Sequence, residues 1–146
     1  MITPMIDKTF KTTLHPPYIL TVFLEDTDAS GFVYHPNYLK YCERARTDLL
    51  YHKGISHGNL IAQQQEMFVV YSMSCKFLAS AHLHDQLCIY TDIESIHGAR
   101  VNLKQSIVKD SQLLVKANIT LAYVDRKSLL PKPIRVPEFI ISALYS

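Results

Sequence analysis

Hydrophobic and polar residues recur along the chain with two different periods, and the change of period predicts its elements. Tyr38, Cys42, Ala45 and Leu49 follow one another at spacings of four, three and four, which is the period of an amphipathic helix. From Met67 onward the period is two, as in strands with one buried face. Four such runs lie at about 67–77, 87–93, 101–107 and 113–123, and three consecutive strands with short turns predict an antiparallel meander.

The remaining segments complete an α+β architecture. Tyr18–Leu24 is apolar and rich in strand formers, so it predicts a strand before the helix. The polar stretch 54–66 predicts a loop, with a turn of helix at 60–65. Prolines at 131, 133 and 137 exclude regular structure until Glu138, and 139–145 predicts a short terminal helix. We therefore expect one domain at 18–146, a long helix wrapped by a curved antiparallel sheet of about five strands, after a flexible lead-in at 1–17.

Composition and charge exclude several classes of protein. The 146 residues are 48% hydrophobic, which suits one domain with a real core. A formal charge of +2 is too small to indicate a nucleic-acid partner. No apolar run approaches the roughly 20 residues that span a membrane, and the first residues contain no secretory signal. The three cysteines, Cys42, Cys75 and Cys88, form no C-x-x-C pair, so we expect buried thiols in a cytoplasmic protein.

An acidic turn stands just before the predicted helix. Glu25, Asp26 and Asp28 precede Gly31, and Pro36 suits the first helical position. His35 would then precede the helix, where it caps weakly and leaves backbone N–H groups free. A carboxylate beside free N–H donors suits acyl-transfer chemistry, although an acidic turn that only caps the helix fits the pattern equally well. Residue type alone does not rank the three carboxylates.

This stretch resembles the signature of a known enzyme family. Residues 24–38, LEDTDASGFVYHPNY, followed by Glu43-Arg44-Ala45-Arg46, resemble hotdog-fold acyl-CoA thioesterases. The likeness is strongest to the YbgC-like, Tol–Pal-associated branch of the 4-hydroxybenzoyl-CoA thioesterase family, and it extends over roughly 18–133. A serine stands at position 30, where many members have a second small, glycine-like residue.

The resemblance implies a role for each matched position. Asp28 corresponds to the catalytic aspartate, acting as general base or as nucleophile, and the backbone N–H of His35 to the donor that polarises the thioester carbonyl. Tyr34 and the His35 side chain would line the acyl site, with Val33 and Tyr38 as further substrate-binding residues. Cations near strand ends would hold the CoA phosphates, with Arg126 and Lys127 preferred and Arg100 a further candidate. The family implies a homodimer with sites at the interface, paired again into a homotetramer.

The same chain contains residues that are compatible with other functions. His82-x-His84-Asp85 has the types of metal ligands, but the sequence identifies no third separated ligand, so we expect neither a metal nor a cofactor. An acyl-CoA hydratase or dehydratase would use His35 and Asp28 for proton abstraction. A non-catalytic scaffold that binds acyl carriers would use only the pocket. Acyl-CoA is the expected substrate, and an acyl carrier protein is a second candidate partner.

Overall fold

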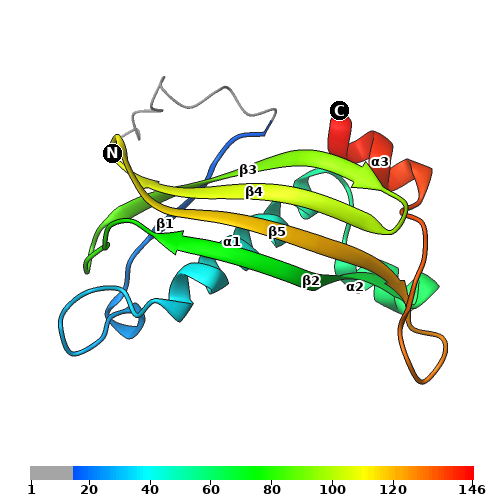
Figure 1. The fold of residues 1–146 in the computed structure, drawn as a ribbon, viewed down its shortest axis with the longest axis horizontal. Coiled ribbons are helices and arrows are strands. Elements are labelled where there is room, and N and C mark those ends of the chain that lie inside the picture. Colours follow the sequence, from blue (N-terminus) through cyan, green and yellow to red (C-terminus); the bar gives the residue numbers. More distant parts are fainter. Residues whose placement is uncertain (1–14) are drawn as a thin grey trace.

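The sheet is fully antiparallel and strongly curved (Figure 1). The computed structural model describes residues 15–146. Five strands lie in the order β1-β3-β4-β5-β2, and a two-residue strand, β6, pairs with the end of β5. Their bounds are Tyr18–Thr21 (β1), Glu66–Phe77 (β2), Gln86–His97 (β3), Arg100–Lys109 (β4), Gln112–Asp125 (β5) and Lys132–Pro133 (β6). The predicted meander, from β3 through β5, is confirmed.

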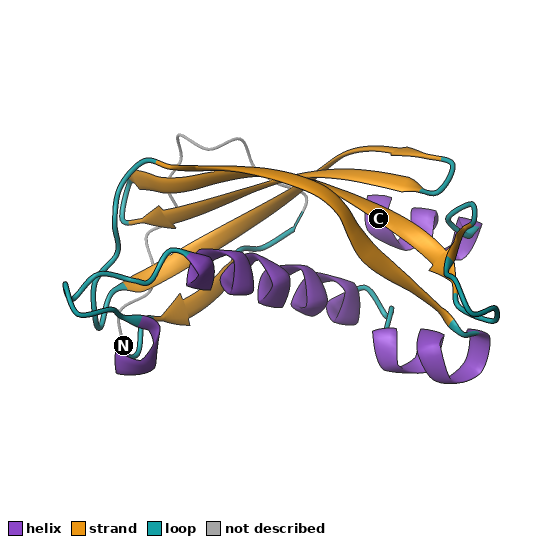
Figure 2. Ribbon diagram, turned by 60° about the horizontal axis from the view of Figure 1, so that its bottom comes forward, coloured by secondary structure: helices purple, strands orange, loops and turns teal. Residues whose placement is uncertain are grey.

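One long helix, α1, runs along one face of this sheet, so that the sheet wraps it (Figure 2). It spans Pro36–His52, with the proline at its first position as predicted. Shorter helices flank it: η1 at Leu24–Asp26, α2 at His57–Asn59, η2 at Leu60–Gln64 and α3 at Glu138–Tyr145. The α+β fold and the terminal helix are therefore as the sequence predicted. None of the described helices is long and apolar enough to span a membrane.

The apolar stripe of α1 is confirmed over most of its length. Tyr38, Cys42 and Ala45 are buried, but Leu49 is only half-buried and Leu50 takes its place in the core. The difference arises because the core at that end of the helix includes Phe68 on β2, and Leu50 belongs to the same cluster. The small residues at positions 42 and 45 let the first half of α1 pack closely on the sheet.

Strand β2 departs from its predicted alternation. A β-bulge lies between Val70 and Ser72, and it shifts the register against β5. Tyr71, expected on the buried face, is 64% exposed. A bulge leaves one residue unpaired and changes which side chains point inward after it. Because β2 is also the last strand of the sheet, much of its side-chain surface stays uncovered.

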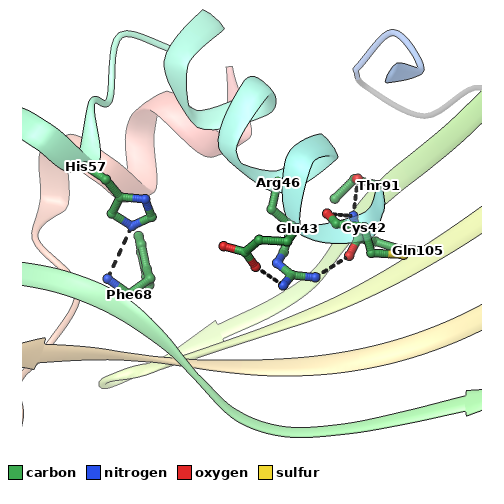
Figure 3. Close-up of polar contacts among 7 residues, drawn as sticks. All are labelled: Cys42, Glu43, Arg46, His57, Phe68, Thr91 and Gln105. Carbon is green, nitrogen blue, oxygen red and sulfur yellow. Dashed lines mark hydrogen bonds and ion pairs between the residues drawn. The ribbon is translucent and has the colours of Figure 1, made fainter. Parts of the chain in front are cut away.

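A buried polar cluster joins the middle of α1 to the sheet (Figure 3). The Gln105 amide, fully buried on β4, donates to the carbonyl oxygen of Cys42 and to Thr91 Oγ1, both at 3.0 Å. Its oxygen accepts a 2.8 Å bond from Arg46 Nη1, and Arg46 Nη2 pairs with the Glu43 carboxylate. Each buried polar group thus has a partner, which removes most of the cost of burying it. These bonds fix α1, and so its first turn, relative to the sheet.

The predicted lead-in at 1–17 lies mostly outside the described residues. His15, one of its last three residues, is buried. Its imidazole contacts the backbone of Leu144 on α3. Burial lowers the pKa of the His15 imidazole, because the charged form loses its hydration.

Candidate active site

The acidic turn folds into a tight hairpin before α1. Thr27 and Val33 form an antiparallel bridge, and the Asp28 N–H donates to the Phe32 carbonyl at 2.9 Å. Gly31 closes the turn by donating to the Asp28 carbonyl at 3.0 Å, with a φ of 85° that glycine adopts without strain. Asp28 is thereby held opposite Phe32. Phe32 stands three residues before His35, the residue that precedes α1.

The Asp28 carboxyl group is exposed and held in one orientation. Its Oδ1 accepts the backbone N–H of Ser30 at 2.9 Å and also the Ser30 hydroxyl. The hydroxyl is the larger cause, and the N–H the second, of a pKa for the Asp28 carboxyl below its ordinary value. Donors to the charged form favour that form, so the carboxylate is ionised throughout the neutral range.

Asp26 has a structural environment despite the same chemistry. It is 5% exposed, and its two oxygens accept the Phe23 backbone N–H and Asn37 Nδ2, both at 2.9 Å. Its carbonyl also accepts the Tyr34 N–H at 2.8 Å. Asp26 therefore joins η1 to the first turn of α1. Of the carboxylates that the sequence left unranked, Glu25 and Asp28 are exposed and Asp26 is occupied by the fold.

The start of α1 leaves a backbone donor available. His35 is the cap residue and its side chain forms no capping hydrogen bond. The N–H groups on either side are used: Tyr34 donates to Asp26, and Asn37 donates to the Tyr34 carbonyl at 2.8 Å. Pro36 has no N–H, and the His35 N–H donates to no acceptor among residues 15–146. A free N–H with the helix dipole behind it can stabilise negative charge on an oxygen.

Aromatic side chains gather around this donor. The His35 ring lies 5.3 Å from Tyr34 and 5.9 Å from Phe77, measured between ring centroids. Tyr34 and Phe77 are about half exposed, so they offer an apolar surface beside His35. Within the hairpin, the Phe32 ring contacts the His82 ring at a tilt of 57°, with 4.7 Å between their centroids. The structure thus brings together two of the predicted residues, Tyr34 and His35, while Asp28 stands earlier on the same segment and bonds to Ser30 and Phe32.

Val33 and Tyr38 lie beneath the hairpin rather than on its surface. They are 5% and 3% exposed, and both belong to the core cluster that includes Leu87 and Ile107. The Tyr38 hydroxyl accepts the Ala81 N–H at 2.9 Å. In the described chain these two residues support the site from below.

The predicted phosphate-binding cations lie at the opposite end of the sheet. Arg126 and Lys127 follow β5, where the Arg126 N–H donates to the Gln65 carbonyl at 2.8 Å, beside the start of β2. Figure 1 shows the segment after β5 and the hairpin before α1 at opposite ends of the molecule. Arg100, the third candidate, stacks on Tyr71 with 3.5 Å between its guanidinium carbon and the ring centroid.

The turn His82-x-His84-Asp85, considered above as a source of metal ligands, forms ion pairs. Asp85 accepts from Lys109 Nζ at 2.9 Å and lies 3.6 Å from His82 Nδ1. Among residues 15–146 no group of three His, Cys, Asp or Glu side chains is placed to hold a metal ion. The cysteines have little nucleophilic character: burial raises the pKa of all three thiols, and that of Cys42 to about 12.

Two contributors were missed from the sequence. Ser30 stood out only as a departure from the family pattern, although Asp-x-Ser is a spacing at which side chain and backbone readily bond. Phe77 comes from the far end of β2, some forty residues later, and no local pattern connects it with His35.

Comparison with known proteins gives consistent results. The model of the thioesterase-like superfamily matches residues 22–144. The acyl-CoA thioester hydrolase YbgC of Escherichia coli O6:H1 is 39% identical over 122 residues, covering 83% of this chain and 89% of the relative. The acyl-CoA thioesterase YbgC of Haemophilus influenzae is 34% identical over 124 residues, covering 85% and 90%.

A solved structure agrees with these relatives. The probable thioesterase from Bartonella henselae superimposes with a TM-score of 0.78 at 32% identity, covering 83% of this chain and 98% of its own. The family match spans both the hairpin with Asp28 and the whole sheet. The chain therefore belongs to the thioesterase-like superfamily, as a hotdog-fold protein of its YbgC-like branch.

Proposed function

We propose that this protein hydrolyses acyl-CoA thioesters to a free acid and CoA, with the Asp28 carboxylate and the His35 backbone N–H as its catalytic groups. The observation that carries this proposal is that one short segment, 28–35, contains both groups. It has an exposed, oriented carboxylate at Asp28 and, at the start of α1, an unused backbone N–H at His35. The relatives named for acyl-CoA thioester hydrolysis support the same reaction.

The carboxylate acts on the thioester in one of two ways. As general base, Asp28 takes a proton from water while the oxygen attacks the carbonyl carbon, and the carbon–sulfur bond then breaks to release CoA. As nucleophile, Asp28 attacks the carbonyl itself, CoA leaves as thiolate, and water hydrolyses the resulting mixed anhydride. Both routes need the ionised carboxylate, and the hydrogen bonds from Ser30 favour that form.

The His35 N–H serves the carbonyl oxygen. That oxygen gains negative charge as the tetrahedral intermediate forms, and a fixed donor in place before the reaction stabilises it. The Tyr34 and His35 rings, with Phe77, provide apolar surface for the acyl group. Val33 and Tyr38 are expected to set the shape of that surface from beneath.

The free edge of β2 supports a homodimer. Four of its large apolar side chains are 38–64% exposed: Val70, Tyr71, Met73 and Phe77. An apolar edge strand with unpaired backbone groups pairs readily with another strand. Two copies of β2, paired antiparallel about a two-fold axis, would join two five-stranded sheets into one of ten strands.

Such pairing would also explain the distant cations. Within one chain, Arg126 lies beside the start of β2 and His35 beside its end. The 12 residues of β2 span about 40 Å, at roughly 3.3 Å for each residue. Antiparallel pairing would bring the start of one β2 to the end of the other. Arg126 and Lys127 of one protomer would then approach CoA phosphates at the other protomer's Asp28. A homotetramer would pair two such dimers.

Release of CoA from a panel of acyl-CoA thioesters tests the reaction. We expect CoA release that follows enzyme concentration, with the preferred acyl group shown by kcat/KM. The panel should span short, medium, long and aromatic acyl groups, and the same groups on an acyl carrier protein. A hydratase would change enoyl-CoA absorbance without releasing CoA, and a scaffold would do neither.

Light scattering and variants test the assembly. We expect the double variant Arg126→Ala/Lys127→Ala to raise KM for acyl-CoA but not for acyl-pantetheine, which lacks the nucleotide phosphates. Lys40→Ala, at an exposed position on α1, is the matched control and should leave both KM values unchanged. An active monomer would contradict the dimer.

A further inference from the structure

We propose that Ser30 is a positioning residue for thioester hydrolysis: it fixes one oxygen of the Asp28 carboxylate and leaves the other free to react. This inference rests on the proposed role of Asp28. It concerns a position at which the resemblance to the hotdog-fold thioesterases implies a small, glycine-like residue in many members, whereas this chain has a serine.

Both hydrogen bonds from Ser30 reach the same carboxylate oxygen. The backbone N–H lies 2.9 Å from Asp28 Oδ1, and the hydroxyl donates to that atom as well. The hydroxyl is held in turn, because its oxygen accepts the Phe32 N–H at 3.4 Å. Phe32 is also the residue whose carbonyl accepts the Asp28 N–H. Hydrogen bonds therefore link Asp28, Ser30 and Phe32 to one another, and Asp28 Oδ1 is the acceptor for both bonds from Ser30.

This arrangement removes a freedom that an exposed aspartate ordinarily has. A solvent-exposed aspartate samples three staggered χ1 wells, and its carboxyl group turns broadly about χ2. Two donors on one oxygen select a single well and a single carboxyl plane. Oδ2 then points in a fixed direction without being used by Ser30. A reactive atom held near its attack geometry spends less of its time in unproductive orientations.

The same donors act on ionisation. Hydrogen bonds to the anion favour it, so the Ser30 hydroxyl first, and the Ser30 N–H second, lower the pKa of the Asp28 carboxyl. Desolvation opposes this effect, and the backbone N–H groups of Phe32 and Asp28 add to it more weakly. No charged side chain among residues 15–146 contributes to the shift. The hydroxyl is therefore the one side-chain group that substitution can remove.

Ser30→Ala and Ser30→Thr form the matched pair of variants. Alanine deletes the hydroxyl and keeps the backbone N–H, and Ser30 does not have the positive φ that would strain a substitution. Threonine keeps a hydroxyl on the same carbon. The measurements are the Asp28 carboxyl pKa by carbon-13 NMR, and the pH dependence of kcat and KM for acyl-CoA hydrolysis.

For Ser30→Ala we expect a higher Asp28 pKa and an acid limb of kcat moved to higher pH in the same direction. At the plateau, kcat should fall by at most about threefold, the limit reached if all three χ1 wells become accessible in place of one, because the retained N–H at position 30 still restrains the carboxylate. KM should stay at the parental value, and Ser30→Thr should restore both the pKa and kcat. A KM increase with unchanged kcat would overturn the proposal, since Ser30 would then contribute to binding.

Two further outcomes separate this inference from the proposed function. If Asp28→Asn is inactive but Ser30→Ala keeps the parental Asp28 pKa and acid limb, the role of Ser30 is wrong and that of Asp28 stands. If Ser30→Ala raises the Asp28 pKa while the acid limb stays in place, the reaction does not depend on Asp28, and both proposals fall.

Discussion

Arg46 and Gln105 bond to each other inside the core, and removing either one leaves the other short of one hydrogen-bond partner. The guanidinium is on a side chain only 7% exposed, and Gln105 is 0% exposed. Water therefore cannot replace the lost hydrogen bond at either group. We expect both Gln105→Leu and Arg46→Met to destabilise the protein, whereas the double variant should recover part of the loss.

The structure sets the size of these effects. In Gln105→Leu the Arg46 donor loses a 2.8 Å bond, and a hydrogen bond to a charged group contributes about 1.5–3 kcal/mol. Glu43 still pairs with Arg46, so the cost stays below the 3–5 kcal/mol of a buried charge without any partner. In Arg46→Met the Gln105 oxygen is left unsatisfied, at about 1–3 kcal/mol. The double variant leaves neither group unpaired, so its cost should fall short of the sum by about 2 kcal/mol.

Urea unfolding at a fixed protein concentration measures this cycle. The free energy of unfolding comes from linear extrapolation, and an unchanged m-value shows that the same surface is exposed in each variant. Fixed concentration matters because dimerisation would itself contribute to stability. If the single costs add to within about 0.5 kcal/mol in the double variant, Arg46 and Gln105 do not interact and the described cluster is wrong.

Three further predictions concern stability and the hairpin. Ala45→Leu should overpack the contact between α1 and the sheet at a residue only 3% exposed, costing about 1–3 kcal/mol; an unchanged thermal midpoint would mean that the stripe is misplaced. Burial lowers the pKa of the His57 imidazole, and its Nε2 accepts the Phe68 N–H at 3.4 Å (Figure 3). The neutral imidazole therefore contributes fully to stability above pH 6.5, and this contribution is lost as pH falls below that value. Thermal melts at several pH values should show this decline, and His57→Gln should flatten it. Gly31→Ala should lower the free energy of unfolding by about 1–2 kcal/mol, because alanine is strained at a φ of 85°, and it should lower kcat by displacing Asp28. A parental kcat would contradict the claim that the hairpin positions Asp28.

Local sequence patterns predicted much of the fold for identifiable reasons. The period of the apolar residues placed Tyr38, Cys42 and Ala45 on the buried face of α1, and Pro36 marked its first residue. The alternating runs predicted the strands, because each has one face on the core. These features depend on near neighbours in the chain, which is the information that a sequence pattern contains.

The rest depended on contacts between distant residues. Arg46 is buried because Gln105, fifty-nine positions later, supplies an acceptor, and its charge alone predicts a solvent-facing residue. The bulge at Tyr71 depends on how β2 pairs with β5. At the site, Asp26 and Asp28 are chemically alike, and the hydrogen bonds of Asp26, a local one with Phe23 and one with Asn37 on α1, assign it to the framework. The role of Asp28 itself stays a prediction.

The kcat of Asp28→Asn, measured beside that of Asp26→Asn, tests the central claim most directly. Asparagine at position 28 keeps the size of the side chain and an oxygen for the Ser30 donors, so folding and KM should survive. Because an amide neither takes a proton from water nor attacks a thioester well, kcat should fall by about 10²–10⁴, or further if Asp28 is the nucleophile. Asp26→Asn should instead lower stability by about 1–3 kcal/mol, through a lost acceptor for the Phe23 N–H or Asn37 Nδ2, with a much smaller change in kcat. Near-parental turnover by Asp28→Asn together with an inactive, folded Asp26→Asn would contradict the account and exchange the two roles.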